Sequence, residues 1–300
     1  MPELPEVEVV RRGVANWVVG RAIEHVTVND ERSLRRHVAG PQDFIDRVTG
    51  LTVTDAQRRG KFLWLPVRSA DETEATRALL VHLGMSGQLL VASNGQPAPR
   101  HERLRFELSP AVSDETGESL PEQLRFVDQR IFGGMLLDPL VPSPQGGGPV
   151  PEHAAHIALD PLDPAFDPAV FHASLRRKKT GIKRALLDQG LISGIGNIYA
   201  DETLWAAQVH WAKRTETISA ATTERLVEAC QAVMRRALDA GGTSFDSLYV
   251  NVNGESGYFA RSLNAYGRAG EPCDRCGAPI ERVKFMNRSS YFCPACQRKR

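Results

Sequence analysis

The sequence predicts an α+β protein in which an N-terminal helix and an antiparallel β-sandwich precede a helical domain and a C-terminal β-ribbon. Three observations support this order. Short apolar runs separated by Gly, Asn and Pro occupy residues 22–137, apolar side chains at helical spacing follow further along, and four of the five cysteines form two pairs near the end. A chain of 300 residues favours about two domains.

The first predicted element is a helix that begins near Pro5 and ends before Gly20. Its apolar side chains recur at helical spacing, and Pro is acceptable in a first helical turn. These apolar positions are Val7, Val10, Val14, Trp17 and Val18. Acidic residues near the start match the positive end of the helix dipole.

Short runs typical of strands fill the next segment, and their spacing predicts the sandwich. Clear examples lie at residues 61–65, 78–83, 89–91, 104–108 and 124–127. Eight prolines and a Gly triplet between residues 139 and 168 indicate a linker. We therefore expect a sandwich domain at 1–138, the linker at 139–168, a helical domain at 169–262 and the ribbon at 263–300.

The second half of the chain shows helical periodicity. An apolar stripe over residues 226–238 predicts one long helix, closed by two glycines. Cys230 lies on that stripe, so we expect it to be an inert core residue. Upstream, two helical segments flank the glycine-punctuated residues 190–197, which predicts two helices joined by a turn.

The four C-terminal cysteines have the spacing of a zinc site. Cys273 and Cys276 are separated by two residues, as are Cys293 and Cys296, with sixteen residues between the pairs. Two such turns complete a closed tetrahedron, so we expect one structural Zn²⁺ with no position for a reactive water. The alternative, two disulfides, needs an oxidising compartment. The metal would stiffen a segment too short for a core of its own.

Charge is distributed unevenly along the chain. The formal net charge is +1, yet residues 261–300 carry nine basic and three acidic side chains, whereas residues 111–175 carry two and ten. Residues 176–184 hold six cations and no anion. Such local fields favour binding of a polyanion. No apolar stretch reaches the ~18 residues of a membrane span, and the N-terminus lacks a secretion signal, so we expect a cytoplasmic protein with no membrane partner.

The N-terminus offers a reactive amine. Removal of Met1 would leave Pro2 with a free secondary amine, and an α-amino group has a pKa nearer neutrality than lysine does. Such an amine can attack a sugar C1′ and form a cationic iminium, which acidifies the C2′ protons. Glu3 follows in sequence, where it can act as acid or base. In the alternative, Pro2 only permits removal of Met1; if Met1 is retained, Pro2 cannot attack.

Motifs along nearly the whole chain resemble the formamidopyrimidine-DNA glycosylase (Fpg/MutM) family. They are residues 2–8 with 11–13, residues 58–63, residues 82–87, residues 192–200, and residues 258–259 with 266–268 before the cysteines. The resemblance implies a helix–two-turn–helix domain and a zinc finger behind the sandwich. It also implies a monomeric DNA glycosylase and AP lyase of base excision repair, which removes 8-oxoguanine and formamidopyrimidines from damaged double-stranded DNA by β,δ-elimination.

The resemblance also implies roles for individual residues. The catalytic group comprises Pro2 as Schiff-base nucleophile, Glu3 as proton donor, Lys61 as a cation assisting β-elimination, and Arg288 as a phosphate ligand assisting δ-elimination. The +6 charge of the ribbon separately favours Arg288, at its tip, as a phosphate contact. Judged from its residue type alone, Lys61 is an exposed lysine at a strand end.

Further residues are expected to bind DNA. Met85, Arg130 and Phe132 would fill the gap left when the damaged nucleotide leaves the stack; without the resemblance, Met85 and Phe132 would be assigned to the core. The expected backbone contacts are His82, His101, Lys178, Lys183 and Asn197. Asn197 stands at a helix start that can offer N–H groups to phosphate, or it is simply the helix N-cap.

The chain also departs from the family pattern. Gln129 and Ile131 replace the Pro and second Arg of many relatives, which puts one opposite-strand contact in doubt. The acidic insertion at 114–118 and the long linker are expected to lie away from DNA. The loop that reads the lesion is expected near residues 242–257. Two alternatives stay open: an endonuclease VIII-type glycosylase for oxidised pyrimidines, and a non-catalytic zinc-finger DNA-binding protein.

Overall fold

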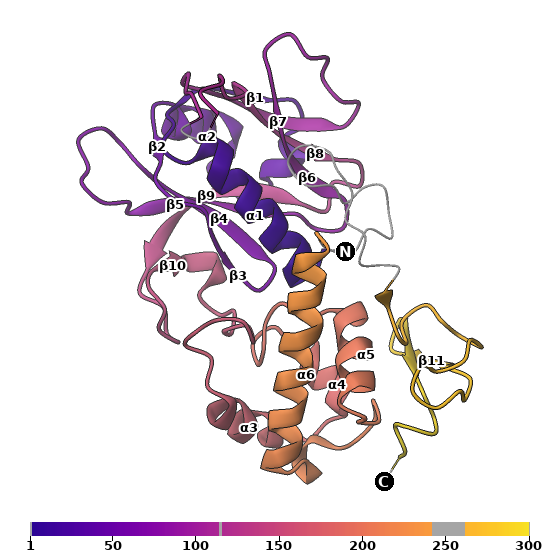
Figure 1. Cartoon of the computed structure of the whole chain (residues 1–300). Helices are drawn as coiled ribbons and strands as arrows, with labels where there is room; N and C mark the ends of the chain where they lie inside the picture. Colours follow the sequence, from indigo (N-terminus) through magenta and orange to yellow (C-terminus); the bar gives the residue numbers. More distant parts are fainter. Residues whose placement is uncertain (1, 114–115, 242–261, 300) are drawn as a thin grey trace.

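The computed structural model describes residues 2–113, 116–241 and 262–299. Figure 1 shows an N-terminal body built on β-sheets, a C-terminal body of helices below it, and the four-cysteine ribbon beside the helices. The predicted α+β order is confirmed. The segment expected to read the lesion, residues 242–257, and residues 114–115 of the acidic insertion lie outside the described residues.

The N-terminal domain is a sandwich of two antiparallel sheets. One has the strand order β1–β7–β8–β6, and the other β10–β9–β5–β4–β2 with β3 paired to β4. Buried side chains alternate along β7, the period expected of a strand with one face in the core. The strands are β1 (Ile23–Val28), β2 (Thr52–Val53), β3 (Gln57–Arg59), β4 (Phe62–Arg68), β5 (Arg77–His82), β6 (Gly87–Ala92), β7 (Glu102–Leu108), β8 (Gln123–Asp128), β9 (Gly134–Val141) and β10 (Val150–Pro151).

Helix α1 (Leu4–Val18) joins the two domain cores. Leu4 packs in the core of the helical domain, whereas four buried valines of the helix pack in the core of the sandwich. These are Val7, Val10, Val14 and Val18, four of the five positions of the predicted stripe. The helix therefore anchors residues 2 and 3 at the junction between the domains. The sandwich also holds a short 3₁₀ helix, η1 (Glu31–Leu34), and α2 (Gly40–Val48).

The Pro/Gly-rich segment is fastened to the sandwich. Its residues 150–151 form β10, which pairs with the end of β9, and a 3₁₀ helix, η2 (Glu152–Ala154), follows. Further along, the buried carboxylate of Asp160 accepts hydrogen bonds from Arg58 Nη1 at 2.8 Å and from the backbone N–H of Gly60 at 3.2 Å. The segment thus holds the turn that carries Lys61.

The C-terminal domain is helical, as expected. It contains α3 (Pro168–Arg177), α4 (Ile182–Leu186), α5 (Asn197–Ala206), the 3₁₀ helix η3 (Thr215–Thr217) and α6 (Ala220–Asp239). Cys230 is 1% exposed on the buried face of α6, which confirms its place in the core. Strands β11 (Glu281–Phe285) and β12 (Arg288–Phe292) form the ribbon. Among the described residues, no helix has both the length and the apolarity needed to cross a membrane.

Candidate active site at the domain junction

The carboxylate of Glu3 caps a helix of the C-terminal domain. Its Oε2 accepts hydrogen bonds from the backbone N–H groups of Gly196 (2.6 Å) and Tyr199 (3.2 Å), and its Oε1 accepts one from Ile198 (3.0 Å). The dipole of α5 favours an anion at this end. The start of α5 therefore holds a carboxylate of the chain itself, where the sequence predicted N–H groups for a phosphate or an N-cap at Asn197. The N-cap residue is Gly196, so the N-cap interpretation of Asn197 is wrong.

A second carboxylate fixes the backbone around Glu3. Glu6 Oε2 accepts the backbone N–H of Glu3 at 2.8 Å, and Glu6 Oε1 accepts the hydroxyl of Tyr199 at 2.9 Å. Because the Glu3 side chain also receives the N–H of Glu6, the two residues form the reciprocal capping box of α1. Pro2, immediately before, is buried as well. The N-terminal residues are thus held in one position by both domains.

Two titratable groups at this junction have shifted pKa values. Burial raises the pKa of the Glu3 carboxyl, although the charge of Lys61 opposes the shift. Burial lowers the pKa of Lys61; Glu3 opposes this shift, while Arg288 adds to it. Both shifts favour the neutral form, in which a carboxyl can donate a proton and an amine can accept one. Such paired shifts are typical of catalytic sites.

A cleft of about 870 Å³ opens between the domains and the ribbon. It brings together four of the predicted site residues from three parts of the chain: Lys61, His82, Lys178 and Arg288. Further cations in its lining, Lys179 and Arg184, make the cleft basic. His156 and Ile157, from the predicted linker, also line the cleft, beside residues that are expected to bind DNA.

His82 is a neutral member of this basic cleft. Burial, together with Arg36, Arg35 and Lys61, lowers its pKa to about 4. The ring stacks on Phe62, with the ring centroids 5.2 Å apart. At neutral pH, His82 can therefore contact a phosphate through a hydrogen bond but not through an ion pair.

The three residues expected to fill the gap lie on two neighbouring turns beside the cleft lining. Met85 is 37% and Phe132 46% exposed, so neither is a core residue. The guanidinium of Arg130 lies 5.0 Å from the centroid of the Phe132 ring. The backbone N–H of Arg130 donates to Ser86 Oγ at 3.1 Å, which ties the two turns together. His101, also expected at the DNA, is half-buried and lies outside the cleft lining.

Lys183 and Asn197 face the protein interior. Lys183 is fully buried, and its Nζ lies 2.7 Å from Asp201 Oδ1. Both Lys183 Nζ and Asn197 Nδ2 donate to the carbonyl of Ser289 at 3.1 Å. Lys183 therefore has no exposed surface for the expected phosphate contact. Instead, Lys183 and Asn197 together fasten the start of β12 to the helical domain, and Arg288 is the first residue of that strand.

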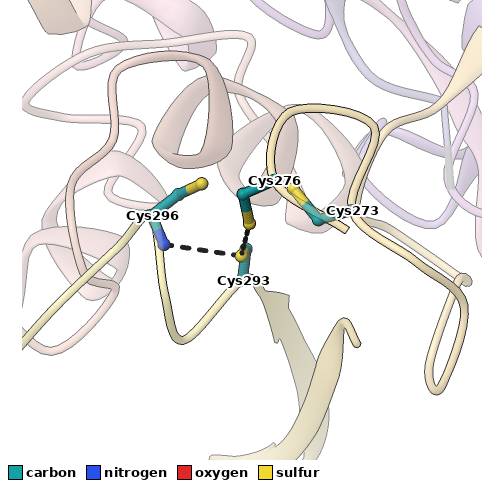
Figure 2. A group of neighbouring side chains, drawn as sticks. All are labelled: Cys273, Cys276, Cys293 and Cys296. Atoms are coloured by element: carbon teal, nitrogen blue, oxygen red, sulfur yellow. Dashed lines mark hydrogen bonds between the residues drawn. The ribbon is translucent and has the colours of Figure 1, made fainter. Parts of the chain in front are cut away.

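The four cysteines fit a tetrahedral metal site. Figure 2 shows their side chains turned toward one another from two loops, and all four sulfur atoms lie within 4.8 Å of each other. A Zn–S bond of about 2.3 Å places the sulfurs of a tetrahedron about 3.8 Å apart, and Cys276 Sγ lies 3.5 Å from Cys293 Sγ. The indole N–H of Trp205 on α5 donates to Cys273 Sγ at 3.3 Å. The donor set matches one structural Zn²⁺, and the cysteines are not paired as disulfides.

Sequence reasoning missed two acidic residues of α5 that hold the ribbon. Glu202, 1% exposed, accepts backbone N–H groups from residues 264, 265 and 266, the segment that leads into the ribbon. Asp201 accepts the hydroxyl of Ser290 and the N–H of Tyr291, each at 3.0 Å. The available signal was two adjacent acids in a helix that is otherwise largely apolar.

Comparisons with known proteins agree with this architecture. Family models match residues 1–135 (formamidopyrimidine-DNA glycosylase N-terminal domain), 157–248 (formamidopyrimidine-DNA glycosylase H2TH domain) and 270–298 (zinc finger found in FPG and IleRS). Similar relatives include the formamidopyrimidine-DNA glycosylases of Thermobifida fusca, 59% identical over 99% of this chain and 97% of the relative, and of Streptomyces coelicolor, 55% identical over 99% and 98%.

Solved structures give the same result. A complex between Lactococcus lactis Fpg and DNA containing an abasic site covers 99% of this chain and 100% of its own, with a TM-score of 0.81 and 30% identity. A structure of MutM with DNA containing carbocyclic 8-oxo-G has a TM-score of 0.80, 30% identity and the same coverage. The resemblance inferred from the sequence motifs is thereby confirmed. The chain belongs to the formamidopyrimidine-DNA glycosylase family.

Proposed function

We propose that this chain excises oxidised purines, 8-oxoguanine and formamidopyrimidines, from duplex DNA and then cleaves the strand, with the imino nitrogen of Pro2 as nucleophile. The observation that carries the proposed chemistry is the buried Glu3 carboxyl, which follows Pro2 and is held by three N–H groups at the start of α5. A carboxyl held in a fixed position beside Pro2 can protonate the sugar as its ring opens.

The reaction proceeds through a covalent intermediate. Once Met1 is removed, the nitrogen of Pro2 forms a bond to C1′ as the bond to the damaged base breaks, and the departing base takes up the proton that the nitrogen loses. Glu3 then donates a proton to O4′ as the sugar ring opens, which leaves an iminium between Pro2 and C1′. Loss of a C2′ proton and cleavage of the C3′–O bond give β-elimination. Loss of a C4′ proton and cleavage of the C5′–O bond then give δ-elimination. Water finally hydrolyses the iminium and restores the amine.

Lys61 and Arg288 serve the elimination steps from the walls of the cleft. Lys61, with its lowered pKa, is suited to exchange a proton with the sugar, and Arg288 is a permanent cation for the departing phosphate. The zinc supplies no chemistry of its own: it stabilises the fold of the ribbon. The ribbon in turn presents Arg288 to the cleft.

Binding uses the basic lining and the two turns. Lys178 offers charge to the DNA backbone, and His82 offers a hydrogen bond. Met85, Arg130 and Phe132 enter the gap left by the damaged nucleotide, where an apolar side chain and a stacked guanidinium recover part of the lost stacking energy. His101 contributes a further contact to the DNA backbone from the sandwich. We further propose that the protein acts as a monomer in the cytoplasm, where thiolates stay reduced.

A lesion panel combined with borohydride trapping tests this function. We expect cleavage of 8-oxoguanine opposite cytosine to exceed cleavage of thymine glycol, and we expect borohydride to trap a covalent complex. A preference for thymine glycol would favour the endonuclease VIII-type alternative. Absence of any trapped complex would leave a zinc-finger DNA-binding protein without catalysis.

A further inference from the structure

The turn between β8 and β9 contains a strained residue. Ile131 has a φ of +56°, in the left-handed region that β-branched residues rarely occupy. This residue lies between Arg130 and Phe132, which are proposed to enter the DNA. A strained conformation persists only where its surroundings hold it in place.

One guanidinium holds the carbonyl side of this turn. Arg35, just after η1, donates from Nη1 to the carbonyls of Ile131 (3.2 Å) and Gly133 (2.9 Å), and from Nη2 to the carbonyl of Phe132 (2.8 Å). The Arg35 side chain is exposed, so it is not needed to fill the core. Three successive carbonyls thus share one cation that comes from a distant part of the chain.

A buried carboxylate holds the N–H side of the same turn. Asp128 is fully buried; its Oδ1 accepts the N–H of Arg130 at 3.1 Å, and its Oδ2 accepts the N–H of Gly133 at 2.8 Å. A Cβ added at Gly84 would lie 2.5 Å from the nitrogen of Gly133, so the turn that carries Met85 packs directly against this one. The turn is therefore held from both sides, and Arg35 is the holder that solvent can reach.

We infer that Arg35 is a positioning residue for eversion of the damaged nucleotide: it stabilises the left-handed conformation at Ile131 and so presents Arg130 and Phe132 to the DNA. This inference rests on the proposed function, in which that pair fills the gap. It assigns Arg35 a role that depends on the residue at position 131. A glycine or asparagine there adopts a positive φ with less strain and needs less support.

A double-mutant cycle in the full-length, zinc-loaded protein tests this dependence. The variants are Arg35→Met, Ile131→Asn and the double variant, with Arg32→Met as control. Arg32 lies in η1, three residues before Arg35, and is exposed, but its guanidinium pairs with Asp30 and not with the turn. Eversion is followed by the fluorescence of a 2-aminopurine beside 8-oxoguanine, borohydride trapping is measured on a preformed abasic site, and thermal unfolding is recorded.

We expect Arg35→Met to slow eversion about tenfold, because the strain is no longer offset. Trapping on the abasic site should change less than about threefold, since no base has to leave the stack there. In the Ile131→Asn background, the effect of Arg35→Met should shrink to less than about threefold. Arg32→Met should match the wild type in eversion.

Several results would overturn the inference. The first is an unchanged rate of eversion in Arg35→Met. The second is an equal slowing of eversion by Arg35→Met in the wild-type and Ile131→Asn backgrounds, which would indicate that Arg35 contacts a phosphate directly. If Arg35→Met does not fold, Arg35→Lys takes its place: it retains the charge but not the fork, and wild-type eversion in it would also refute the inference. A wild-type protein that traps no abasic DNA would refute the proposed function itself, and the inference with it.

Discussion

Replacement of Gly196 by alanine should displace the Glu3 carboxyl without disturbing the helix backbone. A Cβ at this position would lie 2.3 Å from Glu3 Cδ and 2.4 Å from Glu3 Oε1, a separation that no relaxed structure tolerates. The backbone angles of Gly196, φ −121° and ψ −160°, are ordinary extended values that alanine adopts freely. The effect should therefore come from the contact with Glu3 alone.

The magnitude follows from the bonds that Glu3 would lose. A hydrogen bond contributes about 0.5–1.5 kcal/mol net, and Glu3 accepts three at the start of α5. Partial relaxation should leave a loss of about 3 kcal/mol in the free energy of unfolding, or roughly 6–12 °C in Tm. General acid catalysis contributes about 10²–10⁴-fold, so excision of 8-oxoguanine under single-turnover conditions should slow at least about 100-fold.

Gly181→Ala is the matched control. Gly181, like Gly196, is the N-cap residue of a helix, but an added Cβ there finds its nearest atoms at 3.7 Å. This variant should retain excision within about threefold of the wild type, because the methyl group meets only ordinary contacts. If Gly196→Ala excised 8-oxoguanine as fast as Gly181→Ala, the position of Glu3 would not matter and the assignment of Glu3 as the acid would be wrong.

Three further outcomes are expected. The pKa of His82 is about 4 in the folded protein and near 6.5 when unfolded, so the unfolded chain binds the extra proton between these values. Stability should therefore fall by on the order of 3 kcal/mol as pH drops from 6.5 to 4, a component that urea titrations should find missing in His82→Gln. Lys183→Met leaves Asp201 buried without its cation and should lower the free energy of unfolding by about 3–5 kcal/mol. The double variant with Asp201→Asn should recover much of this loss in thermal melts. Equal Tm values for the single and the double variant would contradict the ion-pair account. Removal of zinc by a chelator should abolish δ-elimination and weaken DNA binding in gel-shift assays, because Arg288 loses its support, while the far-ultraviolet signal of the sandwich persists.

Features with a local signature could be predicted from the sequence. The stripe of α1, the strands of the sandwich, the core position of Cys230 and the cysteine cluster all follow from periodicity or spacing over a few residues. The motif resemblance supplied the rest of the expected site. Four expected residues, including Lys61 and Arg288, line one cleft.

Pairings between distant residues could not be predicted in this way. Two hydrogen-bond partners of Glu3, Gly196 and Tyr199, lie 193 and 196 positions further along the chain. A pattern of neighbouring residues carries no information about such distant partners. For the same reason, Lys183 looked like one more cation of a basic run, while its partner Asp201 lies on the next helix. A β-branched residue at position 131 likewise gave no sign of the positive φ that Arg35 supports.

Mapping of the trapped adduct tests the central claim most directly. The full-length protein would be trapped with borohydride on 8-oxoguanine duplex DNA, digested and sequenced by tandem mass spectrometry. The account predicts a chain without Met1 whose deoxyribose remnant is attached to the nitrogen of Pro2. An adduct on Lys61, or a Pro2 still blocked by methionine in the active protein, would contradict it.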